Sequence, residues 1–218
     1  MSNKKIVVIG TDSGMLLNFR EDLLKSLVCT GLFVKTLSSS LNENQKIRLK
    51  SIGVSAKSIP ISRNSLNIVH DIQTIFKIFF AYKKIRPDIV LSYTIKPVIW
   101  GGVASRFIKV DFYALITGLG FAFQGDSFKR KFLTKLVVFL YKAALKKSKA
   151  VIFQNTDNRD VFVSKGIVEL SKTHVVNGSG VDLEKYNVEN LPRGGIKFLC
   201  LSRLLGEKGL REYAEAAK

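Results

Sequence analysis

The residues whose types and spacing best fit a chemical role lie near the end of the chain, between Phe198 and Glu212. Apolar residues come first, a short turn carries Arg203 and Lys208, and a helical pattern follows. An α/β protein holds phosphate at such a strand-turn-helix step, because backbone N–H groups and the helix dipole point at the turn. Arg203 would donate two hydrogen bonds to phosphate oxygens in a bidentate manner, and Lys208 would attract the phosphate as a point charge. By spacing alone, two surface cations at a loop are the simpler interpretation.

Several short motifs resemble one enzyme family. Ser202-Arg203-Leu204 followed by Glu207-Lys208-Gly209 is similar to a signature of the retaining nucleotide-sugar glycosyltransferases of family 4, which have two Rossmann-like domains. The segment from Asn177 to Asp182 resembles that family's Asn-Gly-Val-Asp with two residues inserted. Thr94-Ile95-Lys96-Pro97 and Thr117-Gly118-Leu119-Gly120 are similar to a bacterial subgroup that adds N-acetylhexosamine or hexose to polyprenyl-diphosphate-linked sugars.

The resemblance implies a transferase that moves a sugar from a UDP-sugar to a polyprenyl-diphosphate-linked glycan during surface polysaccharide assembly, with retention and without a metal or other cofactor. Arg203 and Lys208 would stabilise the negative charge that builds on the departing diphosphate. The family's Glu-x7-Glu pair on the donor domain has no counterpart, because Glu212 and Glu215 are wrongly placed. The catalytic residues are therefore not assigned, and the chain alone is expected not to catalyse sugar transfer.

The first turn of the chain is one candidate for binding the acceptor. It carries Thr11, Ser13 and Gly14 after an apolar strand, and the carboxyl ends of strands are where a doubly wound fold binds its ligands. One interpretation is a nest of backbone amides that approaches acceptor hydroxyls or phosphate. The other is turn chemistry alone, and both stay open.

Two later turns also follow predicted strands, so they should lie at the same carboxyl edge of the sheet, around one binding crevice. Lys96, after the strand that ends near Ser92, would bind the acceptor diphosphate or be an ordinary loop lysine. Thr117 stands where many members of the family carry a His near the reacting sugar, so no His role exists there. With Gly118 it still predicts a loop that shapes the acceptor site.

Positive charge is concentrated in one segment. The chain has 35 Lys and Arg against 17 Asp and Glu, a net charge of +18. Residues 128–149 contain no acidic residue, and their basic residues are Lys129, Arg130, Lys131, Lys135, Lys142, Lys146, Lys147 and Lys149. An anionic membrane surface attracts each such residue by about 1 kcal/mol, which predicts membrane binding. The apolar stripe of the same amphipathic helix, through Phe132, Leu136, Phe139, Leu140 and Ala143, is expected to face the core.

The elements that position these residues alternate between strand and helix. Strands are predicted over 6–10, 33–37, 88–92, 112–116, 150–153, 174–176 and 196–201, with helical patterns over 15–28, 44–51, 66–79, 97–108, 128–149 and 156–165, the last with Thr156 as its N-cap. This alternation indicates an α/β fold with a Rossmann-like, doubly wound parallel sheet. We expect a first, acceptor-binding domain over 1–182, a linker over 183–195, and the start of a second Rossmann-like, nucleotide-sugar-binding domain over 196–218. The chain is thus expected to be a fragment.

The remaining composition bears on location and on rival functions. Cys29 and Cys200 each lie in an apolar segment and are expected to be core residues in a reducing compartment. With two histidines, no His/Cys zinc site is expected. No signal peptide or spanning segment is recognised, which predicts a cytoplasmic protein held peripherally on the inner face of the membrane.

Two rival functions stay open. One is a nucleic-acid-binding protein, although the sequence has no recognition motif for nucleic acid. The other is a non-catalytic membrane-bound half that pairs with a separate donor-domain chain.

Overall fold

A computed structural model describes residues 4–61, 68–120, 123, 127–184, 186–190, 194–195, 197–202, 204 and 208–217. The chain divides after Gly180 into two compact units, Met1–Gly180 and Val181–Lys218. The domain limits expected from the sequence, at 182 and 195, stay predictions.

The first unit alternates strands and helices, as predicted. Its elements are β1 (Lys5–Asp12), α1 (Ser13–Cys29), β2 (Phe33–Ser39), α2 (Glu43–Ser51), β3 (Ser55–Ser58), α3 (Ile68–Ile85), β4 (Ile89–Tyr93), α4 (Ile95–Ser105), β5 (Asp111–Ile116), α5 (Phe128–Leu145), β6 (Ala150–Phe153), α6 (Thr156–Ser164), a 3-10 turn over Leu170–Lys172 and β7 (Thr173–Val175). The second unit contains α7 (Leu210–Ala216).

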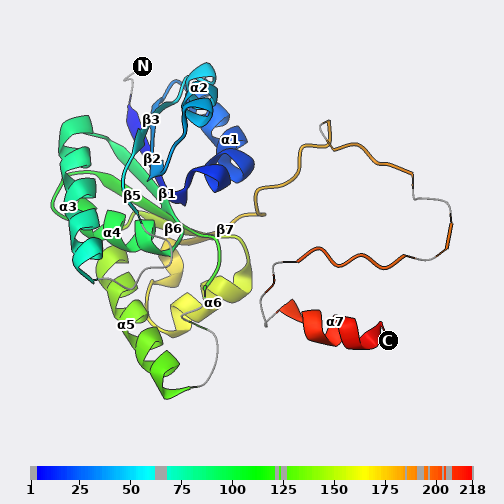
Figure 1. Cartoon of the computed structure of the whole chain (residues 1–218). Coiled ribbons are helices and arrows are strands. Elements are labelled where there is room, and N and C mark those ends of the chain that lie inside the picture. Colours follow the sequence, from blue (N-terminus) through cyan, green and yellow to red (C-terminus); the bar gives the residue numbers. More distant parts are fainter. Residues whose placement is uncertain are drawn as a thin grey trace. The chain divides into compact units, whose positions relative to one another are not determined.

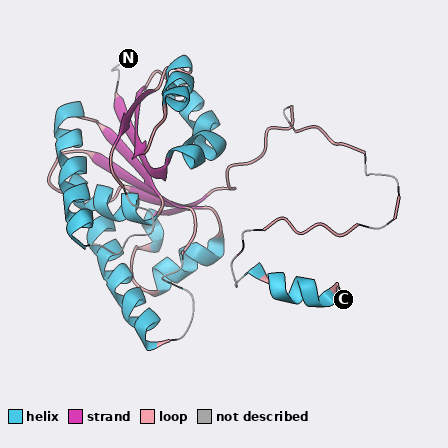
Figure 2. Ribbon diagram, in the orientation of Figure 1, coloured by secondary structure: helices cyan, strands magenta, loops and turns pink. Residues whose placement is uncertain are grey.

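Seven strands form one parallel sheet in the order β3-β2-β1-β4-β5-β6-β7. From β1 the chain runs outward through α1 and α2, returns through α3, and then runs the other way through α4 and α5. Right-handed crossovers therefore place α1 and α2 on one face of the sheet and α3, α4 and α5 on the other, as Figures 1 and 2 show. The predicted doubly wound, Rossmann-like fold is confirmed.

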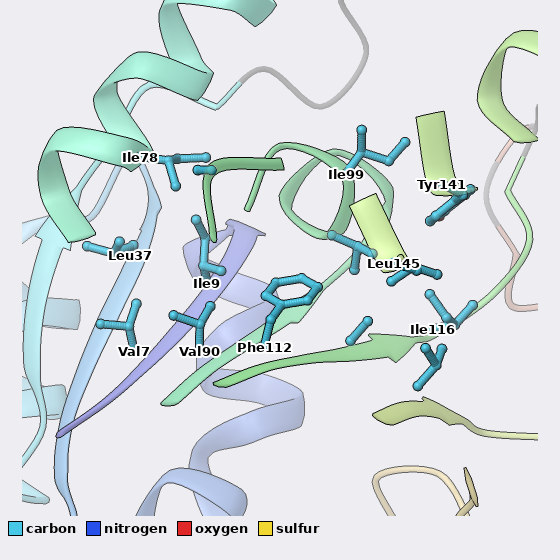
Figure 3. Close-up of a cluster of buried hydrophobic side chains, with 14 of the residues drawn as sticks. Val7, Ile9, Leu37, Ile78, Val90, Ile99, Phe112, Ile116, Tyr141 and Leu145 are labelled. Carbon is cyan, nitrogen blue, oxygen red and sulfur yellow. The ribbon is translucent and has the colours of Figure 1, made fainter. Parts of the chain in front are cut away.

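Apolar side chains fill both faces of the sheet, because central parallel strands are covered on both sides. On the α3–α5 face, Figure 3 shows strand side chains meeting helix side chains, among them Val7, Ile9, Val90, Phe112, Ile78, Ile99, Tyr141 and Leu145. On the other face, Leu16 and Leu24 of α1 pack with Val8 and Val34. This core fixes the strand ends from which the candidate site is built.

The strand predicted over residues 196–201 is wrong for the part that the structure describes. Residues 197–202 have no strand, and Phe198, Leu199 and Leu201 are exposed. A strand needs a neighbour for its backbone hydrogen bonds, and the described residues of this unit provide none. The hydroxyl of Tyr213 in α7 does donate a hydrogen bond to the Phe198 carbonyl, at 3.0 Å.

Three smaller predictions also need correction. The edge strand β3 was missed, because Ser55-Ala56-Lys57-Ser58 has no strand-like alternation and becomes a strand by pairing with β2. The N-cap of α6 is Asn155 and not Thr156, since the Asn155 side chain accepts the Asn158 N–H at 2.8 Å. Both cysteines are exposed, Cys29 because it ends α1 on its solvent side.

Candidate functional site

The site lies at the carboxyl edge of the sheet, where β1 and β4 are neighbours and the strand order reverses. From there α1 starts toward one face and α4 toward the other. In open α/β sheets, connections that diverge in this way form a crevice in which ligands bind. Thr11, Ser13, Gly14 and Lys96 all lie at this edge, as their sequence positions predicted.

The turn after β1 is held by its own side chains. Asp12 is the N-cap of α1, and its Oδ1 accepts the Met15 N–H at 2.8 Å. Ser13 donates to the Ser40 carbonyl at 3.2 Å, and the carbonyl of Thr11 accepts a hydrogen bond from Ser39. Thr11 and Ser13 are buried, so these hydrogen bonds satisfy polar groups that water does not reach. Turn chemistry is thus present here, whether or not a ligand also binds.

Thr94, which the sequence did not single out as a site residue, links the turns after β1 and β4. Its Oγ1 lies 2.6 Å from Thr11 Oγ1. Its backbone has φ 65° and ψ 157°, a region that β-branched residues rarely occupy. Such strain costs about 1–3 kcal/mol and concentrates at binding sites. In the sequence, Thr94 was visible as the first residue of the Thr94-Ile95-Lys96-Pro97 motif, but its strained backbone and its contact with Thr11 were not.

Lys96 is held in a fixed position. It lies in the first turn of α4, and its Nζ is 2.7 Å from Asp71 Oδ1 of α3. Both side chains are about 15% exposed. The ion pair accounts for Lys96 structurally, and a role in binding the acceptor stays a prediction.

The loop after β5 lies against the start of α4. Gly120 has φ +72°, and a side chain there would lie 2.5 Å from Ile95 Cδ1. Thr117 and Gly118, both half-buried, follow β5, which is the neighbour of β4 in the sheet. A side chain built at Gly118 would meet open space. The structure thereby brings the predicted acceptor residues to one edge, and their binding roles remain predictions.

The predicted apolar stripe of α5 faces the core only in part, at Leu140, whereas its larger aromatic residues do not. Phe128, Phe132, Leu136 and Phe139 are exposed, by 87%, 68%, 44% and 67%. The core side is formed instead by Tyr141, Ala144 and Leu145, with Leu140 partly buried against it. The predicted stripe and the true core side lie about a third of a turn apart, and periodicity alone could not decide which one packs.

The basic residues of α5 accompany this exposed stripe. Lys131, Lys135 and Lys142 are exposed, and Arg130 is half-buried. Lys129 lies in α5, but its side chain is outside the described part. Whether these five predicted residues bind a membrane is not tested by the fold. Within the described ranges, no helix combines the length and the apolar character needed to cross a bilayer.

A second exposed stripe runs along α3. It consists of Val69, Ile72, Phe76 and Phe80, which are 48–65% exposed. α3 and α5 flank α4 in the same layer, as Figure 2 shows. This stripe was visible in the sequence as helical periodicity, but there it was indistinguishable from a core side.

The predicted donor residues belong to the second unit. Lys208 is exposed and stands two residues before α7. Arg203 lies outside the described residues. No group of three or more His, Cys, Asp or Glu side chains suited to a metal ion occurs among the residues that the structure describes.

Comparison with protein families decides the affiliation. Residues 10–155 match the family described as "Glycosyl transferase 4-like". The match includes the turn after β1, α4 and the loop after β5, and it covers well over half of the chain. The chain belongs to the glycosyl transferase 4-like family. The resemblance inferred from its motifs is thereby confirmed.

Two curated relatives of this glycosyl transferase 4-like chain are transferases. One, from Campylobacter jejuni, is N,N'-diacetylbacillosaminyl-diphospho-undecaprenol alpha-1,3-N-acetylgalactosaminyltransferase, 25% identical over 188 residues, or 78% of this chain and 49% of the relative. The other, from Escherichia coli, is UDP-Gal:alpha-D-GlcNAc-diphosphoundecaprenol alpha-1,3-galactosyltransferase, 27% identical over 176 residues, or 76% and 44%. The chain spans about half the length of these relatives.

Solved structures show the same fold. A glycosyltransferase from Rickettsia africae ESF-5 gives a TM-score of 0.61 at 17% identity, over 88% of this chain and 47% of that one. The UDP co-structure of S. aureus MnaA gives 0.60 at 18% identity, over 88% and 49%. At these identities the likeness concerns the fold alone.

Proposed function

We propose that this chain is the acceptor-binding part, with the start of the donor part, of a retaining glycosyltransferase that moves a hexosyl or N-acetylhexosaminyl group from a UDP-sugar to a polyprenyl-diphosphate-linked sugar. One observation carries the proposal: both curated relatives, matched over about three quarters of this chain, are named for diphospho-undecaprenol substrates. The crevice between β1 and β4 would bind the sugar and diphosphate of the acceptor.

The described groups at the crevice suit a diphosphate. The starts of α1 and α4 both lie there, and helix starts attract anions through free N–H groups and the helix dipole. Lys96 adds a charge that Asp71 holds in place at 2.7 Å. The hydroxyls of Thr11 and Thr94 could exchange their mutual hydrogen bond for bonds to sugar hydroxyls.

The donor side completes the reaction in this proposal. The bond between the anomeric carbon and the β-phosphate oxygen breaks, and a new bond forms from an acceptor hydroxyl oxygen on the same face of the sugar. The proton of that hydroxyl passes to the departing phosphate of UDP. The electron pair of the broken bond leaves with UDP, where Arg203 and Lys208 would stabilise the developing charge. No metal or other cofactor is part of the proposal.

The membrane surface is the proposed second partner. The exposed aromatic and aliphatic side chains of α5 and α3 form two stripes on neighbouring parts of one layer, and α5 adds exposed lysines without any acidic residue. Scattered exposed apolar residues are ordinary, but two helical stripes beside concentrated positive charge fit an anionic bilayer. The protein would then bind peripherally to the inner face of the cytoplasmic membrane.

The position of the stripes suits a lipid-linked acceptor. α3 follows β3 and α5 follows β5, so the first turns of both helices, with Val69 and Phe128, lie toward the carboxyl edge of the sheet (Figure 1). The crevice between β1 and β4 opens at the same edge. A polyprenyl chain could thus stay in the bilayer while its diphosphate and sugar enter the crevice.

Backbone NMR of the chain tests the acceptor site. Farnesyl-diphosphate-linked N-acetylglucosamine should shift the amide signals of Thr11–Gly14, Lys96 and Thr117–Gly118 in a saturable way, and the monophosphate analogue should bind more weakly. Lys96→Ala should weaken binding of the diphosphate probe, whereas Lys172→Ala, at the amino end of the edge strand β7, should not. Shifts confined to other residues, or tighter binding of a DNA duplex than of the probe, would contradict the proposal.

A further inference from the structure

Arg20 is a buried cation that the proposed reaction does not use. It lies on α1 and is 8% exposed. Its Nη1 donates a hydrogen bond of 2.7 Å to Ser179 Oγ, 159 positions away in the sequence, and one of 3.2 Å to the Phe19 carbonyl. A contact between α1 and the last residues of the first unit is therefore made through this one guanidinium.

The guanidinium rests on the end of β4. Its central carbon lies 5.5 Å from the ring centroid of Tyr93, which is 2% exposed. A cation over an aromatic face is attracted by the ring, more strongly where water is excluded. Burial also lowers the pKa of Arg20 from its ordinary value. Tyr93 thereby fixes where the guanidinium lies, directly beside the carboxyl edge of the sheet.

No carboxylate pairs with Arg20 among the ion pairs of the described residues, and its Nε has no acceptor there. The adjacent Glu21 points elsewhere and pairs with Lys25 and Arg48. A buried charge is costly unless hydrogen bonds satisfy it, and a charged donor makes a stronger hydrogen bond than a neutral one. The hydrogen bond from Arg20 to Ser179 is therefore stronger than one that a neutral donor would make to the same hydroxyl.

Ser179 stands in a segment with few other restraints. It lies between Gly178 and Gly180, and Gly180 has φ +68°. The last backbone hydrogen bond before this segment joins the Val176 N–H to the Phe153 carbonyl at 2.9 Å. For residues 177–180, the bond to Arg20 is the single hydrogen bond within the described chain. Because the first unit ends at Gly180, this bond holds the point where the chain leaves it.

We propose that Arg20 is a positioning residue that fixes the exit segment, residues 177–180, against α1, so that backbone freedom between the two units begins after Gly180. Tyr93 supports the guanidinium, and Ser179 is its acceptor on the exit segment. If the proposed transfer is correct, this anchor fixes the point at which the chain leaves the acceptor-binding part.

Nitrogen-15 relaxation of the 218-residue chain tests the anchor without any transfer assay. In the wild type, the amides of Gly178, Ser179 and Gly180 should have order parameters close to those of the sheet. Arg20→Met or Ser179→Ala should lower them to about 0.6 or less, the range of flexible backbone. The double variant should resemble either single one, since both changes remove the same bond.

Matched variants separate positioning from a general loss of structure. Ser179→Thr keeps the hydroxyl and should preserve the wild-type order parameters, whereas Arg159→Met, on α6, should change none of them. Ser179 is exposed, so Ser179→Ala tests the anchor even if Arg20→Met fails to fold. Unchanged order parameters in Ser179→Ala would overturn the inference. Because no substrate is added, this result is independent of the proposed function.

Discussion

The ring of Tyr93 occupies the space that a side chain at Gly10 would fill. A Cβ at Gly10 would lie 2.1 Å from Tyr93 Cζ and 2.3 Å from its hydroxyl oxygen. The glycine in β1 thus allows the last residue of β4 to lie across its neighbouring strand. From there Tyr93 supports Arg20 on one side and leads into Thr94 on the other.

Gly10→Ala should therefore destabilise the protein. Tyr93 is buried and cannot move aside without disturbing α1, so we expect a loss of roughly 2–4 kcal/mol in the free energy of unfolding, in the range of overpacked cores and strained sites. Urea unfolding followed by circular dichroism measures it. Gly118→Ala is the control, because among the described residues, its chain neighbours aside, none comes within 4 Å of the new Cβ. Equal free energies of unfolding for the two variants would show that the Tyr93 ring can move aside for a side chain at position 10.

Stability should depend on pH through Glu21. Burial alone would raise its pKa, but Lys25 at 3.0 Å and Arg48 at 2.7 Å outweigh burial and hold the pKa of Glu21 below its usual 4.5. A carboxylate with a lowered pKa in the folded state stabilises the protein above its ordinary pKa and loses this contribution as the pH falls. The free energy of unfolding should thus fall from about pH 5 to pH 3 more steeply in the wild type than in Glu21→Gln.

Chemical unfolding at several pH values checks this dependence. Glu189→Gln, at an exposed carboxylate, serves as the control and should keep the wild-type slope. If Glu21→Gln keeps that slope as well, the ion pairs of Glu21 with Lys25 and Arg48 do not contribute to folding.

Membrane binding should have an apolar and an electrostatic part. Phe132→Ser combined with Phe139→Ser should weaken binding to anionic vesicles at least about tenfold, since each buried Phe contributes roughly 1.5–3 kcal/mol. Lys131→Gln with Lys135→Gln should also weaken binding, at about 1 kcal/mol for each lysine, and should flatten its steep salt dependence. Vesicle sedimentation measures both effects.

Phe19→Ser is the matched control for the membrane stripes. Phe19 is 54% exposed but lies on α1, across the sheet from α3 and α5, so its replacement should leave vesicle binding unchanged. Equal binding of the wild type to neutral vesicles at high salt would contradict the electrostatic part of the proposal.

The order of strands and helices could be predicted because each central strand is a short apolar run between turns, as in Ile6–Ile9 and Ile89–Leu91. The same rule failed for residues 197–201, since an apolar run becomes a strand only beside a partner, and it failed for β3, which pairing with β2 creates. Local sequence cannot contain that information.

The candidate site was predictable in part for the same reason. Thr11, Lys96 and Thr117 lie at or just after the carboxyl ends of β1, β4 and β5, and the predicted strand positions sufficed to place them at one edge. The contacts of Thr94 with Thr11 and of Arg20 with Ser179 join residues 83 and 159 positions apart, and such pairs become visible only once the chain is folded.

The donor assignment predicts a large effect on transfer. In a protein that carries this sequence and extends to the length of its relatives, Arg203→Ala or Lys208→Ala should lower kcat/KM by roughly 100-fold or more, because each would stabilise charge on the leaving UDP. Lys197→Ala, an exposed lysine in the same unit, is the control. Thermal melting should show that all three variants fold. Unchanged turnover in both Arg203→Ala and Lys208→Ala would refute the donor assignment.

The most direct test compares two ligands of the 218-residue chain by isothermal titration calorimetry. The central claim is that this chain contains the acceptor site and only the start of the donor site. It predicts a cooperatively melting protein that binds short-chain polyprenyl-diphosphate-linked N-acetylglucosamine saturably, that binds UDP-sugars weakly at most, and that transfers no sugar alone. Tight binding of a UDP-sugar without binding of the lipid-linked sugar would contradict it.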